Sequence, residues 1–255
     1  VNEVKPQKDP PKEQLQRLII QFNQGQLQQV LEEVELLLED FQNSVVLYNL
    51  KGAINAGLKK FDIAIASYKQ AIKIKPDYAE AHCNLANAFR DMGDPENAIR
   101  NYKKAIKIKP NFAEAYNNLG LALYEKGNFQ EAKKNFEYAI KNRPNFAEAH
   151  SNLGGVFGDT GYQDKAIDYY KSAIRIKPNF PEAHNNLGNA LLLRGDLKAA
   201  KDSYGQAIRL RPDYVEVHKK ISSIKTYKKQ DQQFLQMKKI YEKHILSEDE
   251  LCQIS

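Results

Sequence analysis

The sequence predicts an all-α fold in which antiparallel helix pairs stack on one another to form a solenoid. The first observation is a proline that recurs every 34 residues, at Pro76, Pro110, Pro144, Pro178 and Pro212. The second is a pair of alanine series with the same step, Ala64, Ala98, Ala132, Ala166, Ala200 and Ala71, Ala105, Ala139, Ala173, Ala207. The third is an aromatic series, Tyr68, Tyr102, Phe136, Tyr170 and Tyr204. A fixed period of this length indicates a repeat protein, because one helix pair cannot bury both of its faces alone.

Each repeat begins with a helix that ends at a glycine. In residues 113–146 the helix Ala113–Lys126 places Ala115, Leu119 and other apolar residues on one face. Gly127 follows, where a helix end favours the left-handed conformation that glycine adopts freely. The equivalent positions hold Gly93, Gly161 and Gly195. Lys59 is the exception, so we expect a strained backbone there.

The second helix of this repeat, Phe129–Lys141, ends before Pro144, because proline lacks an N–H group and clashes with the preceding turn. Helices are therefore predicted near 45–57 and 61–75, repeating every 34 residues to about 211. Candidate N-caps of the first helices are Asp77, Asn111, Asn145, Asn179 and Asp213. Glutamate stands three residues after each of them, at Glu80, Glu114, Glu148, Glu182 and Glu216. This spacing predicts capping boxes.

The two ends of the chain depart from the repeat. Residues 1–12 are polar and are expected to be disordered, and residues 13–44 form a divergent capping repeat with amphipathic runs at Leu15–Phe22 and Val30–Leu38. Residues 215–246 are predicted to form C-terminal capping helices, one over 215–228 and a longer one at Gln232–His244. Residues 247–255 open a further helix with a capping box at Ser247. The sequence stops inside that helix, which suggests a truncated piece of a longer chain.

The pattern resembles the tetratricopeptide repeat (TPR). The residues that carry the resemblance in one repeat are Tyr116, Leu119, Gly120, Leu123, Ala132, Phe136, Ala139 and Pro144. Five units match, at 45–78, 79–112, 113–146, 147–180 and 181–214, with Lys51 and Ala86 as departures from the usual leucine and glycine. The resemblance implies a right-handed superhelical solenoid whose first helices line the concave face. It also implies a scaffold for protein–protein interaction.

Catalytic motifs are absent from the sequence, so we predict a non-catalytic chain without cofactor or metal. There is no glycine-rich phosphate loop and no Gly-x-Ser-x-Gly motif. Four histidines share one position of the repeat, His82, His150, His184 and His218. We interpret them as packing residues, since equivalent positions lie a helix spacing apart and cannot share a metal. Two cysteines, no secretion signal and no long apolar run favour a cytoplasmic protein.

Asparagines recur on the first helices, and they are the candidate peptide-binding residues. One position of the repeat holds Asn84, Asn118, Asn152 and Asn186, the position before it Asn49, Asn117 and Asn185, and the position one turn on Asn87 and Asn189. An amide can pair with a peptide N–H and C=O together. The row is similar to the asparagine ladder of O-linked N-acetylglucosamine transferases. This resemblance implies mostly exposed side chains on the concave face. The alternative is that the amides bond neighbouring helices.

Other partners are less favoured by the sequence. Repeats that clamp the carboxylate tails of chaperones use a lysine at a position where this chain has Asn49, Cys83, Asn117, Ser151 and Asn185. Two periodic basic series are present, Lys73, Lys107, Lys141, Arg175, Arg209 and Lys75, Lys109, Arg143, Lys177, Arg211. We assign them to the C-terminal ends of helices, where cations are favourable. Nucleic-acid binding is disfavoured because the regular aromatics occupy packing positions.

The function predicted from the sequence is a scaffold that binds protein or peptide partners in an extended conformation. One alternative is a substrate-recruiting region of a larger sulfotransferase or glycosyltransferase. The segment His218–Ser255, with Ser222–Ile224, Tyr227 and Ser247–Leu251, resembles the tail that follows the repeats in bacterial TPR sulfotransferases. A second alternative is a self-assembling scaffold whose degenerate ends stack on other copies.

Overall fold

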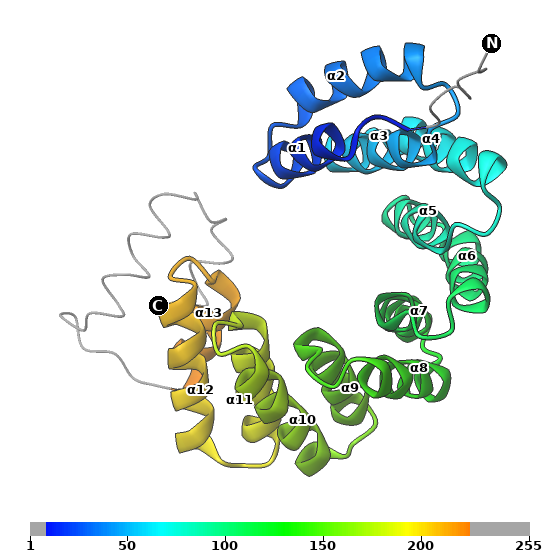
Figure 1. The fold of residues 1–255 in the computed structure, drawn as a ribbon. Helices are drawn as coiled ribbons and strands as arrows, with labels where there is room; N and C mark the ends of the chain where they lie inside the picture. The colour runs from blue at the N-terminus through cyan, green and yellow to red at the C-terminus, as the bar shows by residue number, and fades with distance from the viewer. Residues whose placement is uncertain (1–8, 225–255) are drawn as a thin grey trace, which may run out of the picture. The chain divides into compact units, whose positions relative to one another are not determined.

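A computed structural model describes residues 9–224, and in that range all regular structure is helical (Figure 1). The helices are α1 (Lys12–Asn23), α2 (Leu27–Asp40), α3 (Val45–Gly57), α4 (Phe61–Ile74), α5 (Ala79–Asp91), α6 (Pro95–Ile108), α7 (Ala113–Glu125), α8 (Phe129–Asn142), α9 (Ala147–Asp159), α10 (Gln163–Ile176), α11 (Pro181–Leu193), α12 (Leu197–Leu210) and α13 (Val215–Ile224). The chain divides into two compact units, with the boundary between Asn142 and Arg143 in the sequence. The first unit contains α1–α8 and the second contains α9–α13.

The predicted helix pairs are confirmed. The first pair is α3 and α4, and every later odd-numbered helix begins 34 residues after the one before it, up to α13 at Val215. Each of the five periodic prolines lies between two helices, as predicted. No helix described for the chain is both long and apolar enough to cross a bilayer.

Four of the five regular helix pairs are closed by an aromatic ring that packs against a glycine, and the pair α5–α6 has Ala86 in place of the glycine. A Cβ atom added to Gly120 of α7 would lie 2.7 Å from Cε1 of Phe136 in α8. The same contact joins Gly52 to Tyr68, Gly154 to Tyr170 and Gly188 to Tyr204. In these four pairs an added Cβ would force the ring or the helix to shift, because real Cβ contacts are not this short. Periodic alanines such as Ala132 and Ala139 are fully buried beside the ring and let the helices approach closely.

The turns inside the pairs have the predicted left-handed residue. Gly127 has φ +77°, and Gly93, Gly161 and Gly195 have φ between +79° and +90°. Lys59 takes the same place in the first repeat with φ +60°. A side chain is strained in this conformation, so the expectation of a strained Lys59 is confirmed.

The predicted capping boxes are wrong. The helices begin where predicted, but their N-cap residues lie one position after the candidates, at Tyr78, Phe112, Phe146 and Phe180, and none of these makes a side-chain cap hydrogen bond. Asp77 and its equivalents thus lie before the N-cap. The N-cap residues are aromatic, and their rings are half-buried or buried at the junction between two repeats. We attribute the start of each helix to the packing of this ring.

Three of the periodic glutamates, Glu80, Glu148 and Glu182, instead pair with cations of the second basic series, whereas Glu216 pairs with Lys220. Lys109 donates from Nζ to Oε1 of Glu80 at 2.8 Å, and the same Nζ lies 4.5 Å from the centroid of the Phe112 ring. Lys177, Glu148 and Phe180 repeat this arrangement in the second unit. Partial burial opposes ionisation of Glu80, but the hydrogen bonds from Lys109 and from its own backbone N–H lower the pKa of that carboxyl. At these two junctions one cation therefore contacts both a ring and a carboxylate.

The ends of the described region agree with a divergent first repeat. Helices α1 and α2 pack on α3 through an aliphatic cluster, which includes Leu18, Val30, Val34, Leu47 and Ile54. Helix α1 begins at Lys12, one residue before the predicted boundary. Helix α13 begins as predicted, whereas the helices expected at 232–244 and 247–255 lie outside the described residues, as do residues 1–8.

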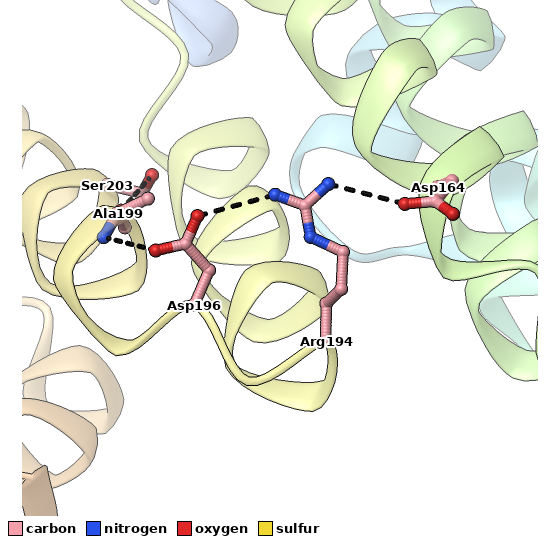
Figure 2. A network of polar contacts seen from close by, with 5 residues as sticks. All are labelled: Asp164, Arg194, Asp196, Ala199 and Ser203. Atoms are coloured by element: carbon pink, nitrogen blue, oxygen red, sulfur yellow. Dashed lines mark hydrogen bonds and ion pairs between the residues drawn. The ribbon is translucent and has the colours of Figure 1, made fainter.

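Polar contacts also join successive pairs inside the second unit. Figure 2 shows Arg194, the C-cap residue of α11, which bridges two carboxylates. Its Nη1 lies 3.3 Å from Oδ1 of Asp164 in α10, and its Nη2 lies 3.4 Å from Oδ2 of Asp196. Asp196 is the N-cap of α12 and accepts the N–H of Ala199 at 3.3 Å. This one guanidinium therefore ties the α11–α12 turn to α10.

Candidate binding surface

The predicted binding asparagines all lie on first helices, from α3 to α11. In the first unit α3 contacts α5 and α5 contacts α7, whereas the second helices α4, α6 and α8 make at most marginal contacts with one another (Figure 1). The first helices therefore lie on the inner side of the stack within this unit. In the second unit α9 likewise contacts α11.

Asparagine amides connect neighbouring first helices in the first unit. Asn84 donates from Nδ2 to Oδ1 of Asn49 at 3.1 Å, which joins α5 to α3. Asn118 donates from Nδ2 to Oδ1 of Asn87 at 3.0 Å, which joins α7 to α5. Asn117 in turn donates to Oδ1 of Asn118 at 3.2 Å. The amides thus form a row of hydrogen bonds that crosses the stack.

The second unit has a shorter version of this row, which includes a lysine. Asn185 donates from Nδ2 to Oδ1 of Asn186 at 3.2 Å. Lys220 of α13 donates from Nζ to Oδ1 of Asn185 at 3.2 Å. Sequence reasoning missed Lys220, although it stands 34 residues after Asn186 and so occupies the same position of the repeat.

The expectation that the asparagines are mostly exposed is wrong. Asn84, Asn118, Asn152 and Asn186 are half-buried, as are Asn49, Asn87 and Asn189. Asn117 and Asn185 are buried, with 6% and 4% of their surface exposed. The physical reason is that neighbouring first helices approach closely enough for an amide on one to reach an amide on the next.

Two tyrosine hydroxyls also take part in the amide network. Tyr102 of α6 donates from its hydroxyl to Oδ1 of Asn87 at 2.6 Å. Tyr204 of α12 donates to Oδ1 of Asn189 at 2.8 Å. Both rings are fully buried. The sequence pattern predicted that these rings pack in the interior, but it did not predict the hydrogen bonds of their hydroxyl groups.

The four histidines have structural partners, as the packing interpretation requires. Each ring lies with Nε2 near the carbonyl oxygen of the proline six residues earlier, at 3.0 Å for His82, 3.0 Å for His150, 3.2 Å for His184 and 2.9 Å for His218. A histidine nitrogen that donates to a carbonyl holds the loop before its helix. No group of three potential metal ligands occurs among residues 9–224.

Cys83 lies in the same row of first-helix positions and is buried. Burial, with nearby carboxylates as a second cause, raises the pKa of its thiol to about 12. The thiolate is the nucleophilic form of cysteine, so Cys83 contributes no nucleophile to this surface at neutral pH.

Comparison with protein families identifies the repeats along most of the described chain. A family model described as TPR repeat matches residues 58–93 and 86–127. Two models described as tetratricopeptide repeat match residues 117–181 and 181–214.

Solved structures of similar fold include both shorter and longer chains than this one. The crystal structure of MamA is 31% identical, covers 65% of this chain and 96% of its own, and superposes with a TM-score of 0.57. YrrB, described as a TPR protein with an unusual peptide-binding site, is 18% identical over 72% of this chain and 95% of its own, with a TM-score of 0.56. The Cut9–Hcn1 structure from the APC/C is 18% identical over 93% of this chain and 47% of its own, with a TM-score of 0.76. The last two show the fold alone.

A curated relative of the chain is an enzyme of much greater length. The probable UDP-N-acetylglucosamine–peptide N-acetylglucosaminyltransferase SEC of Arabidopsis thaliana is 34% identical over 79 residues. The match covers 30% of this chain and 8% of the relative, so the chain corresponds to a small part of that enzyme.

Proposed function

Because the chain belongs to the tetratricopeptide repeat family, we propose that it is an interaction scaffold whose first helices bind extended peptide segments. The observation that carries the proposal is the row of asparagine amides on the inner side of the first unit. Most of these amides are half-buried, two of their hydrogen bonds cross between helices, and a shorter row is present in the second unit.

The amides in this row keep hydrogen-bonding capacity after their contacts with one another. Each amide group has two N–H donors and an oxygen with two lone pairs. Asn84 uses one donor on Asn49 and has no further partner in the described residues, so its oxygen and its second hydrogen are available. A peptide in an extended conformation presents N–H and C=O groups along its edge. Amides at the spacing of the repeats would bind that edge without reading the side chains.

The fold is compatible with this function. YrrB has the same fold and is described as having a peptide-binding site. The match with the Arabidopsis enzyme favours a second candidate, a region that recruits peptide substrates for a larger glycosyltransferase. The name of that enzyme describes a peptide as the acceptor. Both candidate functions therefore require binding of a peptide, and we assign it to the same surface of first helices. The likeness of the tail to TPR sulfotransferases stays a prediction, since most of that segment lies outside the described residues.

The test is a variant in which Asn84, Asn118, Asn152 and Asn186 are all replaced by alanine. The probe is a 12-residue peptide selected on the wild-type protein from an unbiased display library. Each lost amide contact should cost about 0.5–1.5 kcal/mol of binding free energy, so the combined variant should bind at least about thirtyfold more weakly. Its melting temperature should also fall modestly, because the amides bond one another, and binding must be measured well below that temperature.

A matched control replaces four exposed asparagines of the loops, Asn111, Asn128, Asn145 and Asn179, by alanine. This control changes the same chemistry away from the first-helix surface and should bind the peptide as wild type does. Equal affinities for wild type, control and the first-helix variant would show that the amides are scaffolding alone.

A further inference from the structure

The amide of Asn87 has an environment that fixes its orientation. Its oxygen accepts two hydrogen bonds, from the Tyr102 hydroxyl at 2.6 Å and from Nδ2 of Asn118 at 3.0 Å. Two donors that converge on one atom occupy both lone pairs of the carbonyl oxygen. Turning the amide by 180° would place an NH2 group against the N–H donor of Asn118, so only one orientation satisfies both contacts.

This orientation leaves the nitrogen of Asn87 facing away from the scaffold. Nδ2 has no hydrogen-bond partner among the described residues. It is also not one of the polar side-chain atoms that are buried there without a partner. Nδ2 is therefore accessible to solvent, although the Asn87 side chain as a whole is half-buried. The result is an N–H donor at a fixed place on the inner side of the first unit.

The hydroxyl that fixes the amide is protonated at neutral pH, and burial of its ring extends that state to higher pH. Burial raises the pKa of Tyr102 above its usual range, and it raises the pKa of Tyr204 to about 12. Tyr204 contacts Asn189 in the second unit just as Tyr102 contacts Asn87. The repeat 113–146 lacks both groups, since it has Phe136 and Leu121. The two remaining repeats have the tyrosine with Ala53 or Gly155 in place of the amide.

A second polar atom lies one turn away on the same helix. Asn84 is fixed through its nitrogen, which donates to Asn49, and its oxygen has no described partner. Residues three apart on a helix are neighbours, with about 5–6 Å between their Cβ atoms. Helix α5 thus presents an acceptor from Asn84 and a donor from Asn87, which is the pair that complements a peptide N–H and a peptide C=O.

We infer that Tyr102 is a positioning residue, which holds the amide of Asn87 so that α5 offers a fixed donor for a backbone carbonyl of a bound peptide. Tyr204 does the same for Asn189. The inference rests on the proposed function, and it adds the direction of the hydrogen bonds to the ligand. At Asn87 and Asn189 the surface selects an acceptor group in the ligand and disfavours a donor.

The positioning can be measured without a ligand, by NMR of the side-chain amide groups in the free protein. In wild type the Asn87 NH2 group should be ordered, with an order parameter near 0.85, and in Tyr102→Phe it should fall below about 0.6. Tyr68→Phe is the matched control, because Tyr68 has the same place in its repeat, and that repeat has Ala53 at the position of Asn87. It should leave the Asn87 signal unchanged. An unchanged order parameter in Tyr102→Phe would overturn the inference.

Asn87→Asp tests the donor itself. One carboxylate oxygen can still accept from Tyr102 and Asn118, while the other replaces the outward donor by an acceptor. The selected 12-residue peptide should bind this variant at least tenfold more weakly than wild type, and Tyr102→Phe should lose about threefold to tenfold. Wild-type affinity in both variants would overturn the inference and leave the proposed function standing. The proposed function fails only if the first-helix alanine variant also binds as wild type does.

Discussion

The repeats 45–78 and 113–146 have the same interior but different ends. In both, a ring of the second helix packs on a glycine of the first, Tyr68 on Gly52 and Phe136 on Gly120. Helix α3 starts at a polar cap, because Ser44 Oγ accepts the N–H of Leu47 at 3.2 Å, whereas α7 starts after Phe112 without a side-chain cap.

The difference shows which parts of a repeat depend on its neighbours. The glycine–ring contact lies within one helix pair, so it recurs wherever both residues recur. The start of α3 follows the divergent helix α2, and Val46 stands where later repeats have a glutamate. Without that glutamate the carboxylate–cation contact of a regular junction cannot form, and a local polar cap satisfies the helix N-terminus instead.

The largest effect is expected from a methyl group at the shared interior. Gly52→Ala and Gly120→Ala should each reduce the free energy of unfolding by about 1–3 kcal/mol, because the new Cβ overlaps the ring and the pair must move apart. Ala86 occupies the equivalent position in its own repeat, so both variants should fold. Urea titration gives the two values.

The matched control is Gly205→Ala in α12, where an added Cβ would meet no atom within 4 Å. This change should stabilise by about 0.5–1 kcal/mol, since alanine is the better helix former. A large difference between Gly52→Ala and Gly120→Ala would contradict the view that the two interiors are equivalent.

The next effect concerns the turn at the end of the first helix. Gly127→Val should destabilise by about 1–2 kcal/mol, because a β-branched residue resists the left-handed conformation. Lys59→Val should cost less, since Lys59 at φ +60° already has most of the strain. Thermal melts of the two variants check the order. Equal shifts in melting temperature would show that the two turns differ in more than their residue.

A smaller effect is expected at the starts of the helices. Ser44→Ala should cost about 1 kcal/mol through the lost cap hydrogen bond. Asn111→Ala, which alters the residue before Phe112, should leave the free energy of unfolding within error, because Asn111 is exposed and is not the N-cap. A loss at Asn111 as large as that at Ser44 would restore the capping box that the structure contradicts.

The smallest effect depends on pH and on the position that holds Tyr48 and Tyr116 in the two compared repeats. His218 has this place in α13, and burial lowers its pKa, against the opposing hydrogen bond with the Pro212 carbonyl. The unfolded chain therefore binds more protons below about pH 6.5, and stability should fall as the pH decreases through that range.

His218→Tyr should remove this part of the pH dependence. The measurement is the melting temperature at pH 7.5 and pH 5.5 for both proteins. Nδ1 of His218 is buried without a described partner, so protonation there would place an unpaired charge in the interior. The same slope in wild type and variant would mean that other groups account for the acid sensitivity.

The interior was predictable from the sequence because its determinants recur inside each repeat. The alanines, the rings, the turn glycines and the prolines all keep one step, and the structure confirms what that step predicts. The helix starts were not predictable from local spacing. Asp77 and Glu80 match a capping box, but Glu80 is paired with Lys109, which is 29 residues later in the chain.

The candidate surface was predictable only in part, for a related reason. The register of the asparagines could be deduced from the period, but their burial depends on the distance between successive first helices. Tyr102 satisfied the packing pattern completely, so nothing in the pattern pointed to its hydrogen bond with Asn87. Lys220 could have been found by extending the period of Asn186 by one further step.

The junction of Lys109, Phe112 and Glu80 also affects how such a gene can change. The same kinds of residue recur 68 positions later, at Lys177, Phe180 and Glu148, a multiple of the 34-residue step. An unequal crossover between two copies, in frame and in register, would delete or duplicate a helix pair and leave a junction of the same chemistry at the splice. The number of repeats can therefore change in a single genetic event, without a new interface having to evolve.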